Sequence, residues 1–178
     1  APYMETNHAA FQCPNFGPSQ VDRFVHSSHN RIMSGYAYNG STLGEGVKYD
    51  YSNYPTVTGQ PHFKKFRDIT QLTRTIAFAD SAVYNTWSTD NVNTPGDFIE
   101  NWTLCPPALG SAQYPPTATI HFRHSGAANV AFMDGHVETR SPHYLTNQSS
   151  EQLERDLGYI TDGDINNEAL QDNLYDDQ

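Results

Sequence analysis

The sequence predicts a mainly β fold of the α+β class, with an antiparallel sheet, long loops and a short helical appendage at the C-terminus. The clearest apolar alternation, at residues 118–140, predicts a β-meander, and the connections elsewhere are rich in Pro, Asn, Thr and Gly. Helical spacing of apolar residues begins only near the C-terminus. The length of 178 residues suits one domain of ordinary size with a small appendage. We therefore expect a β domain over 1–145 and an acidic helical appendage over 146–178.

Three segments before the meander are also predicted as strands. Ser34–Asn39 places two tyrosines at period two, and Gly46–Tyr51 is a second candidate. Arg74–Asp80 is a stronger one, because its apolar side chains alternate. Residues 81–117 are rich in Asn, Thr and Pro and show little periodicity, which indicates a long surface connection or insertion.

The meander prediction depends on two turn signals. Ala118–His124 and Asn129–Asp134 are separated by the loop Ser125–Ala128, which contains a glycine, and this pattern is typical of a β-hairpin. Asp134-Gly135 then turns the chain into His136–Arg140. We expect these three strands to pair in sequence order.

The C-terminal segment changes character. Ser149 and Gln152 match the spacing of a capping box, which predicts a helix beginning there. A loop follows, and then a second short helix is predicted from the spacing of Leu170 and Leu174.

The charge is concentrated near the C-terminus. The formal net charge is −10, and the segment Glu151–Gln178 holds nine acids and one base. A duplex nucleic-acid binder needs a basic footprint, and an anionic membrane attracts basic segments, so both partners are excluded. No stretch approaches the roughly 20 apolar residues of a membrane-spanning helix.

The two cysteines, Cys13 and Cys105, are compatible with one disulfide or with two buried thiols. Export from the cell would favour the disulfide. Each cysteine precedes a proline, which places it in extended or turning backbone. Because the sequence has no third cysteine, a zinc site made of thiolates is not expected.

One run of residues carries a specific resemblance. Between Phe122 and Glu138 the sequence has His124, nine further residues, and then Asp134-Gly135-His136. This run resembles the C-terminal signature of the prepilin-type, His-x9-Asp-Gly family of pseudopilin-like proteins.

Three weaker elements resemble that family in the same order, namely Cys13-Pro14, Ser34–Asn39 and Thr75–Asp80, so the resemblance covers roughly residues 11–140. Family members begin with a prepilin leader and a long apolar helix, and we expect the present sequence to correspond to the globular part without that helix. The resemblance implies a secreted structural protein, at the cell surface or outside the cell, whose subunits assemble into filaments.

The signature admits a structural and a functional interpretation. In the structural one, His124 bonds to the Asp134 carboxylate or to turn backbone, and Gly135 supplies a turn that a Cβ would hinder. In the functional one, Asp80 and Asp134 are paired carboxylates at neighbouring strand ends and bind Ca²⁺. Pseudopilins similar to this fold are sometimes stabilised by Ca²⁺, which supports the second interpretation.

Two further metal sites can be weighed from the sequence. The acidic loop near the C-terminus resembles the start of a Ca²⁺ loop, with candidate ligands Asp162, Asp164, Asn166 and Glu168, but it lacks the Gly and Glu that complete an EF-hand. Its alternative is a solvated loop in which Asp164 caps the next helix. Zinc held by His121, His124 and His136 is disfavoured, because residues three apart in a strand face opposite sides.

These observations favour a secreted, non-catalytic, pseudopilin-like subunit that assembles with itself into an extracellular filament or tube, with Ca²⁺ as a candidate cofactor. The alternative is a non-polymerising accessory pseudopilin or carbohydrate-binding module, in which Trp87 and Trp102 stack on a sugar. A third alternative is an enzyme that uses His124, Asp134 and His136. No GxSxG, HExxH or phosphate-loop motif supports it.

Overall fold

The structure is a computed structural model of the whole chain. It describes residues 13–16, 25–26, 31–32, 35–44, 46–50, 56, 58–84, 98–99, 101–107, 117–167, 169–171 and 173–175. These residues form mostly short strands in antiparallel sheets with few helices, which confirms the predicted fold class.

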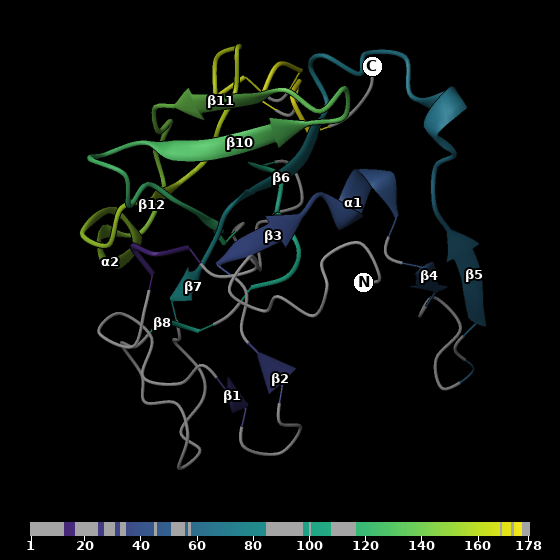
Figure 1. Cartoon of the computed structure of the whole chain (residues 1–178), viewed down its shortest axis with the longest axis horizontal. Coiled ribbons are helices and arrows are strands. Elements are labelled where there is room, and N and C mark those ends of the chain that lie inside the picture. The colour runs from purple at the N-terminus through teal and green to yellow at the C-terminus, as the bar shows by residue number, and fades with distance from the viewer. Residues whose placement is uncertain are drawn as a thin grey trace.

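A four-stranded antiparallel sheet is the centre of the fold (Figure 1). Its order is β11 (Val137–Arg140), β10 (Ala128–Phe132), β6 (Ile76–Asp80) and β3 (Tyr36–Tyr38). The strands predicted around 34–39 and 74–80 are therefore neighbours inside this sheet. Ala37, Ala79 and Val130 are buried at paired positions on one face, and Phe78 on the other face of β6 is exposed.

The remaining strands form two-stranded sheets, and the helices are short. The pairs are β9 (Ile120–His121) with β12 (Leu157–Gly158), β4 (Gly46–Asp50) with β5 (Thr58–His62), β7 (Val83–Tyr84) with β8 (Phe98–Ile99), and β1 (Val25–His26) with β2 (Arg31–Ile32). The helices are α1 (Gly40–Leu43), α2 (Ser150–Leu153) and the 3₁₀ turn η3 (Phe66–Asp68). Within the described residues, no helix has the length and apolar character needed to span a membrane.

The predicted meander is half right. β10 and β11 form the expected hairpin, with Ala131 opposite Val137 and a turn at Gly135, whose φ is 93°. β9, however, pairs with β12 and not with β10. The turn between β9 and β10 is tight, since His124 and Ala127 exchange both backbone hydrogen bonds. Beyond this turn the two strands do not pair with each other. The reason is competition, because β6 occupies the edge of β10 that β9 was expected to take.

Residues from both sides of the predicted boundary at 145/146 share the same core. Ile160, Leu174 and Tyr175 pack with residues of the central sheet such as Ala37 and Val130. Asn39 strengthens this contact, because its side-chain amide donates to the carbonyl of Tyr175 at 2.7 Å. The acidic C-terminal segment is thus built into the same core as the sheet.

The two predicted C-terminal helices have different outcomes. α2 begins as expected, with the Ser149 hydroxyl accepting a hydrogen bond from the Gln152 backbone N–H at 3.3 Å. The second helix is wrong, because the described residues around Leu170 and Leu174 form turns. The Leu170 carbonyl accepts from the Thr161 hydroxyl at 3.2 Å, so a side chain competes for the group that a helix would use.

Candidate functional site

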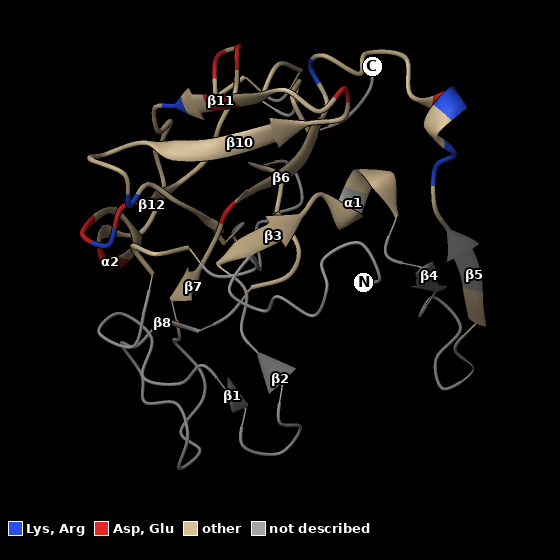
Figure 2. Cartoon of the chain, viewed as in Figure 1, with Lys and Arg blue, Asp and Glu red and all other residues tan. Residues whose placement is uncertain are grey.

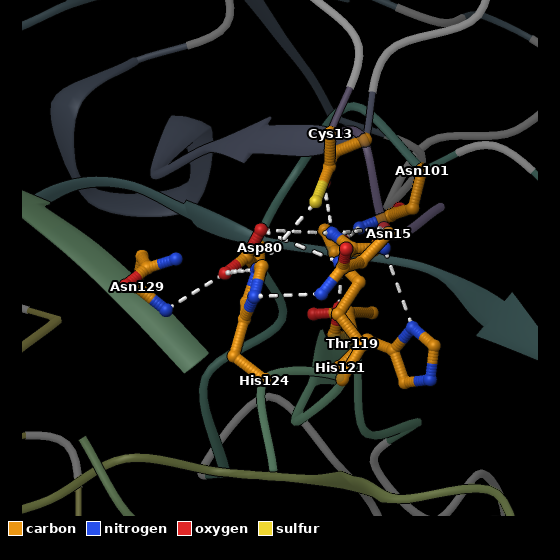
Figure 3. A network of polar contacts seen from close by, with 11 residues as sticks. Cys13, Asn15, Asp80, Asn101, Thr119, His121, His124 and Asn129 are labelled. Carbon is orange, nitrogen blue, oxygen red and sulfur yellow. Dashed lines mark hydrogen bonds and ion pairs between the residues drawn. The ribbon is translucent and has the colours of Figure 1, made fainter. Parts of the chain in front are cut away.

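The buried carboxylate of Asp80 lies in a network of polar contacts (Figure 3). It ends β6 and lies opposite the start of β10, so the backbone N–H of Asn129 donates to its Oδ2 at 2.7 Å. On the other side, Arg123 donates to Oδ1 from Nη2 at 3.1 Å and from Nε at 3.3 Å. The negative charge is therefore paired inside the fold, which is what makes its burial tolerable.

Arg123 connects this carboxylate to the segments around it. Its guanidinium is nearly inaccessible, with 4% of the side chain exposed, and it also donates to the backbone carbonyls of Gly35 and Ser81. The cation lies 4.3 Å from the centre of the Phe16 ring. One arginine thus joins β3, β6 and the N-terminal segment 13–16.

His124 brings the cysteine of that N-terminal segment to the carboxylate. Its Nε2 lies 3.2 Å from Asp80 Oδ2 and 3.5 Å from Cys13 Sγ, while its Nδ1 lies 3.3 Å from the Asn15 amide nitrogen. The sulfur, the carboxylate oxygen and the ring nitrogen all lie within 4.8 Å of one another. Because both contacts fall on the same ring nitrogen, the three residues do not form the relay of a Cys-His-Asp nucleophile, which uses opposite nitrogens.

His121 is buried next to Arg123. Its pKa is lowered to about 3, first by burial and then by the nearby charges of Arg123 and His124. Arg123 Nη1 lies 3.3 Å from His121 Nδ1, and the ring packs against Phe98 at 4.7 Å between centroids. The imidazole is therefore neutral at physiological pH and acts as an acceptor inside the fold.

The second cysteine, Cys105, does not bond to Cys13. Both Cys13 and Cys105 are thiols, so the disulfide left open by the sequence is not formed here. The Cys105 sulfur contacts the carbonyl of Pro106 at 3.8 Å, and its backbone N–H donates to the Thr119 hydroxyl at 2.9 Å.

The two signature residues that were expected to bond to each other do not do so. His124 precedes β10 and faces Asp80, whereas Asp134 follows β10 and binds His136 at 2.5 Å between Oδ1 and Nδ1. The Asp134 carboxylate also accepts the His136 backbone N–H at 3.1 Å, which closes the turn at Gly135. His124 and Asp134 thus make separate contacts at the two ends of β10.

The same geometry separates the predicted calcium pair. β6 and β10 are antiparallel, so the end of one strand lies beside the start of the other. Asp80 consequently lies beside Asn129, while the backbone of Asp134 bonds to Leu72, before β6 begins. The expectation of neighbouring strand ends holds for parallel strands and was wrong for this pair.

The oxygen side chains of the C-terminal loop have partners within the chain. Asp162 pairs with Arg140 at 2.6 Å and with Arg74 at 3.6 Å. Asp164 accepts the backbone N–H of Asn166 at 3.0 Å, and the Asn166 carbonyl oxygen accepts from Thr146 at 2.9 Å. Glu168 lies outside the described residues.

Sequence reasoning selected Asp80 and His124 but missed their principal partners. Arg123 stands inside the signature, next to His124, and that position was the available signal. Cys13 was considered for a disulfide, as a buried thiol and as part of the family resemblance, but not as a partner of Asp80 and His124. For the carbohydrate alternative, Trp102 is 60% exposed and Trp87 lies outside the described residues.

Comparison of the chain with protein-family models, with curated proteins and with solved structures finds no match.

Proposed function

We propose that this chain is a non-catalytic structural protein that assembles with copies of itself outside the cell, as a pseudopilin-like subunit. The observation that carries the proposal is an apolar row across the outer face of the central sheet, formed by Tyr38, Phe78, Ala131 and Val137. These residues are direct partners on neighbouring strands, in that order. With strands about 4.8 Å apart, the row is roughly 14 Å long.

Two side chains of the row are largely exposed, and a hollow lies beside them. Phe78 is 48% and Val137 is 64% exposed, and the rings of Tyr38 and Phe78 lie 5.3 Å apart. Beside them is a hollow of about 310 Å³, lined by Tyr36, Phe78, Ala79, Asn129, Ala131 and Val137. A face that carries both projecting apolar side chains and a hollow can pack against an apolar face of the same kind.

Charge supports a second copy as the occupant. Two chains that each carry a formal charge of −10 repel one another, so contact is least costly where the surface is neutral. β3 and β10 contain no charged residue (Figure 2), and the side chains partnered across this face are uncharged except for Asp80, which is paired with Arg123. The acidic loops lie elsewhere, so the neutral row can meet its copy without placing carboxylates together.

The polar network supports a structural role for the signature. Asp80 and Cys13 are buried, and their contacts join the N-terminal segment to β6 and β10. These groups tie the N-terminal segment to the face that carries the exposed row, two residues along β6 from Phe78, and their arrangement favours no nucleophile. Ca²⁺ remains a candidate for stabilising the assembly, and the test below therefore includes it.

The test is the assembly state of the purified chain, measured by sedimentation velocity and negative-stain microscopy with Ca²⁺ and with a chelator. We expect concentration-dependent oligomers for the natural chain and monomers for Phe78→Gln. Phe66→Gln is the matched control, because Phe66 is 59% exposed on η3, outside the central sheet. A natural chain that stays monomeric at high concentration in both buffers, or a Phe78→Gln variant that assembles normally, would refute the proposal.

A further inference from the structure

We propose that Cys13, Asp80 and His124 bind one zinc ion, independently of the assembly proposed above. The three residues come from the N-terminal segment, the end of β6 and the turn before β10, and their ligand atoms converge in Figure 3. Neither calcium site considered from the sequence contains this set.

The spacing of the ligand atoms matches a tetrahedral site. With Zn–S near 2.3 Å and Zn–N or Zn–O near 2.05 Å, two ligands at a tetrahedral angle are separated by about 3.5 Å for sulfur and nitrogen and about 3.3 Å for nitrogen and oxygen. The observed separations are 3.5 Å between Cys13 Sγ and His124 Nε2, and 3.2 Å between that nitrogen and Asp80 Oδ2. The third pair, the Cys13 sulfur and an Asp80 carboxylate oxygen, lies within 4.8 Å.

Hydrogen bonding accounts for this convergence less well. One ring nitrogen carries either one proton or one lone pair, so Nε2 can make only one good hydrogen bond. Here it faces both a sulfur and a carboxylate oxygen. A metal ion satisfies all three atoms at once, and its binding releases the thiol proton of Cys13 to solvent.

Neighbouring residues already orient the ligands. Arg123 holds Asp80 Oδ1, and the Asn129 N–H donates to Oδ2, which fixes the carboxylate in place. Asn15 lies beside His124 Nδ1, where a metal-bound histidine carries its proton. Rotation of the Asn15 amide by half a turn would present its oxygen to that proton, and amide orientation is assigned from such networks.

The ligand chemistry selects zinc over calcium. A thiolate and an imidazole are poor ligands for Ca²⁺, which prefers six to eight oxygens, and are common ligands for Zn²⁺. Cys13 and Asp80 are buried, whereas His124 is 23% exposed, so a water molecule can reach the fourth position from the histidine side. With three ligands far apart in the sequence, the ion would cross-link the N-terminal segment to the sheet.

The first test measures binding directly. Calorimetric titration of the reduced, metal-free chain with Zn²⁺ should give one site, and Co²⁺ should produce the absorption bands of tetrahedral thiolate coordination. X-ray absorption of the zinc-loaded natural chain should show one sulfur and three nitrogen or oxygen ligands. This readout needs no variant, so a folding defect cannot obscure it. No tight binding, or a coordination shell without sulfur, overturns the proposal.

The second test assigns the residues. Cys13→Ser should abolish the thiolate bands and weaken zinc binding at least tenfold, and His124→Gln should weaken it similarly, while both variants keep a natural far-ultraviolet dichroism spectrum. Cys105→Ser and His136→Gln are the matched controls and should bind as the natural chain does. If Cys105→Ser loses the bands and Cys13→Ser retains them, the site is assigned to the wrong cysteine.

Discussion

The buried pair of Arg123 and Asp80 gives the sharpest stability prediction. Arg123→Met keeps the length and apolar contact of the side chain but removes its charge and its donors. Asp80 would then remain fully buried without its cationic partner, keeping only the Asn129 N–H and the contact with His124 on Oδ2, and breaking a buried pair in this way costs about 3–5 kcal/mol. The carbonyls of Gly35 and Ser81 lose the guanidinium as a donor as well, but the Gly35 carbonyl still accepts the backbone N–H of Ser81 at 2.9 Å.

The measurement is urea denaturation at neutral pH with a chelator present, so that metal binding does not contribute. Arg67→Met is the matched control, because Arg67 pairs with Asp68 at 3.4 Å but the two side chains are 77% and 55% exposed. An exposed pair contributes about 0–1 kcal/mol, so this variant should be nearly as stable as the natural chain.

Adding Asp80→Asn to Arg123→Met should recover part of the loss, since a neutral amide does not need the guanidinium. If Arg123→Met costs less than about 1 kcal/mol, or no more than its control, then the buried pair does not stabilise the fold as argued.

Three further predictions follow from single contacts. Because the folded-state pKa of His121 is about 3 against 6.5 unfolded, stability should fall as pH drops from 6.5 towards 3, by up to about 1.4 kcal/mol per pH unit, and His121→Leu should flatten that slope in urea titrations. Gly163→Ala should lower stability by about 1–3 kcal/mol in thermal unfolding, because a Cβ there would lie 2.7 Å from the Leu170 carbonyl oxygen. The side-chain hydrogen bond to Asp134 raises the pKa of His136, while the His136 backbone N–H and then its imidazole lower the pKa of Asp134. Their pairing therefore stabilises the fold above the folded-state pKa of Asp134 and is lost as pH rises through that of His136. Asp134→Asn should return the His136 pKa, followed by NMR, towards its ordinary value, and an unchanged titration would contradict this.

Local patterns were sufficient where the strand partner is close in sequence. The alternation in β10 follows from a sheet with one face on the core, and the Asp134-Gly135 pair predicts the turn into β11 because glycine adopts a positive φ without strain. The Ser149 cap was predictable for the same reason, since donor and acceptor are three residues apart.

Long-range pairing could not be read from these patterns. β9 has the composition of a strand, but nothing in it identifies β12, more than 30 residues later, as its partner. The period-two pattern states that a strand has a buried face, and it does not state which edge meets which strand. The site shares this difficulty, because Asp80 and His124 acquire their roles only when β6 lies beside β10 and Cys13 folds over both.

The spacing within the signature now has a physical explanation. Nine residues separate His124 from Asp134, and they contain the tight turn after His124 and the whole of β10. That length places His124 before the start of β10, where Asp80 and Cys13 meet. It places Asp134 after the end of β10, where it closes the turn into β11. Insertion or deletion of one residue in β10 would move its inward side chains to the outer face and would disrupt the contacts of both His124 and Asp134. The spacing in this chain is therefore explained by one strand with two separate attachments, without a direct bond between His124 and Asp134.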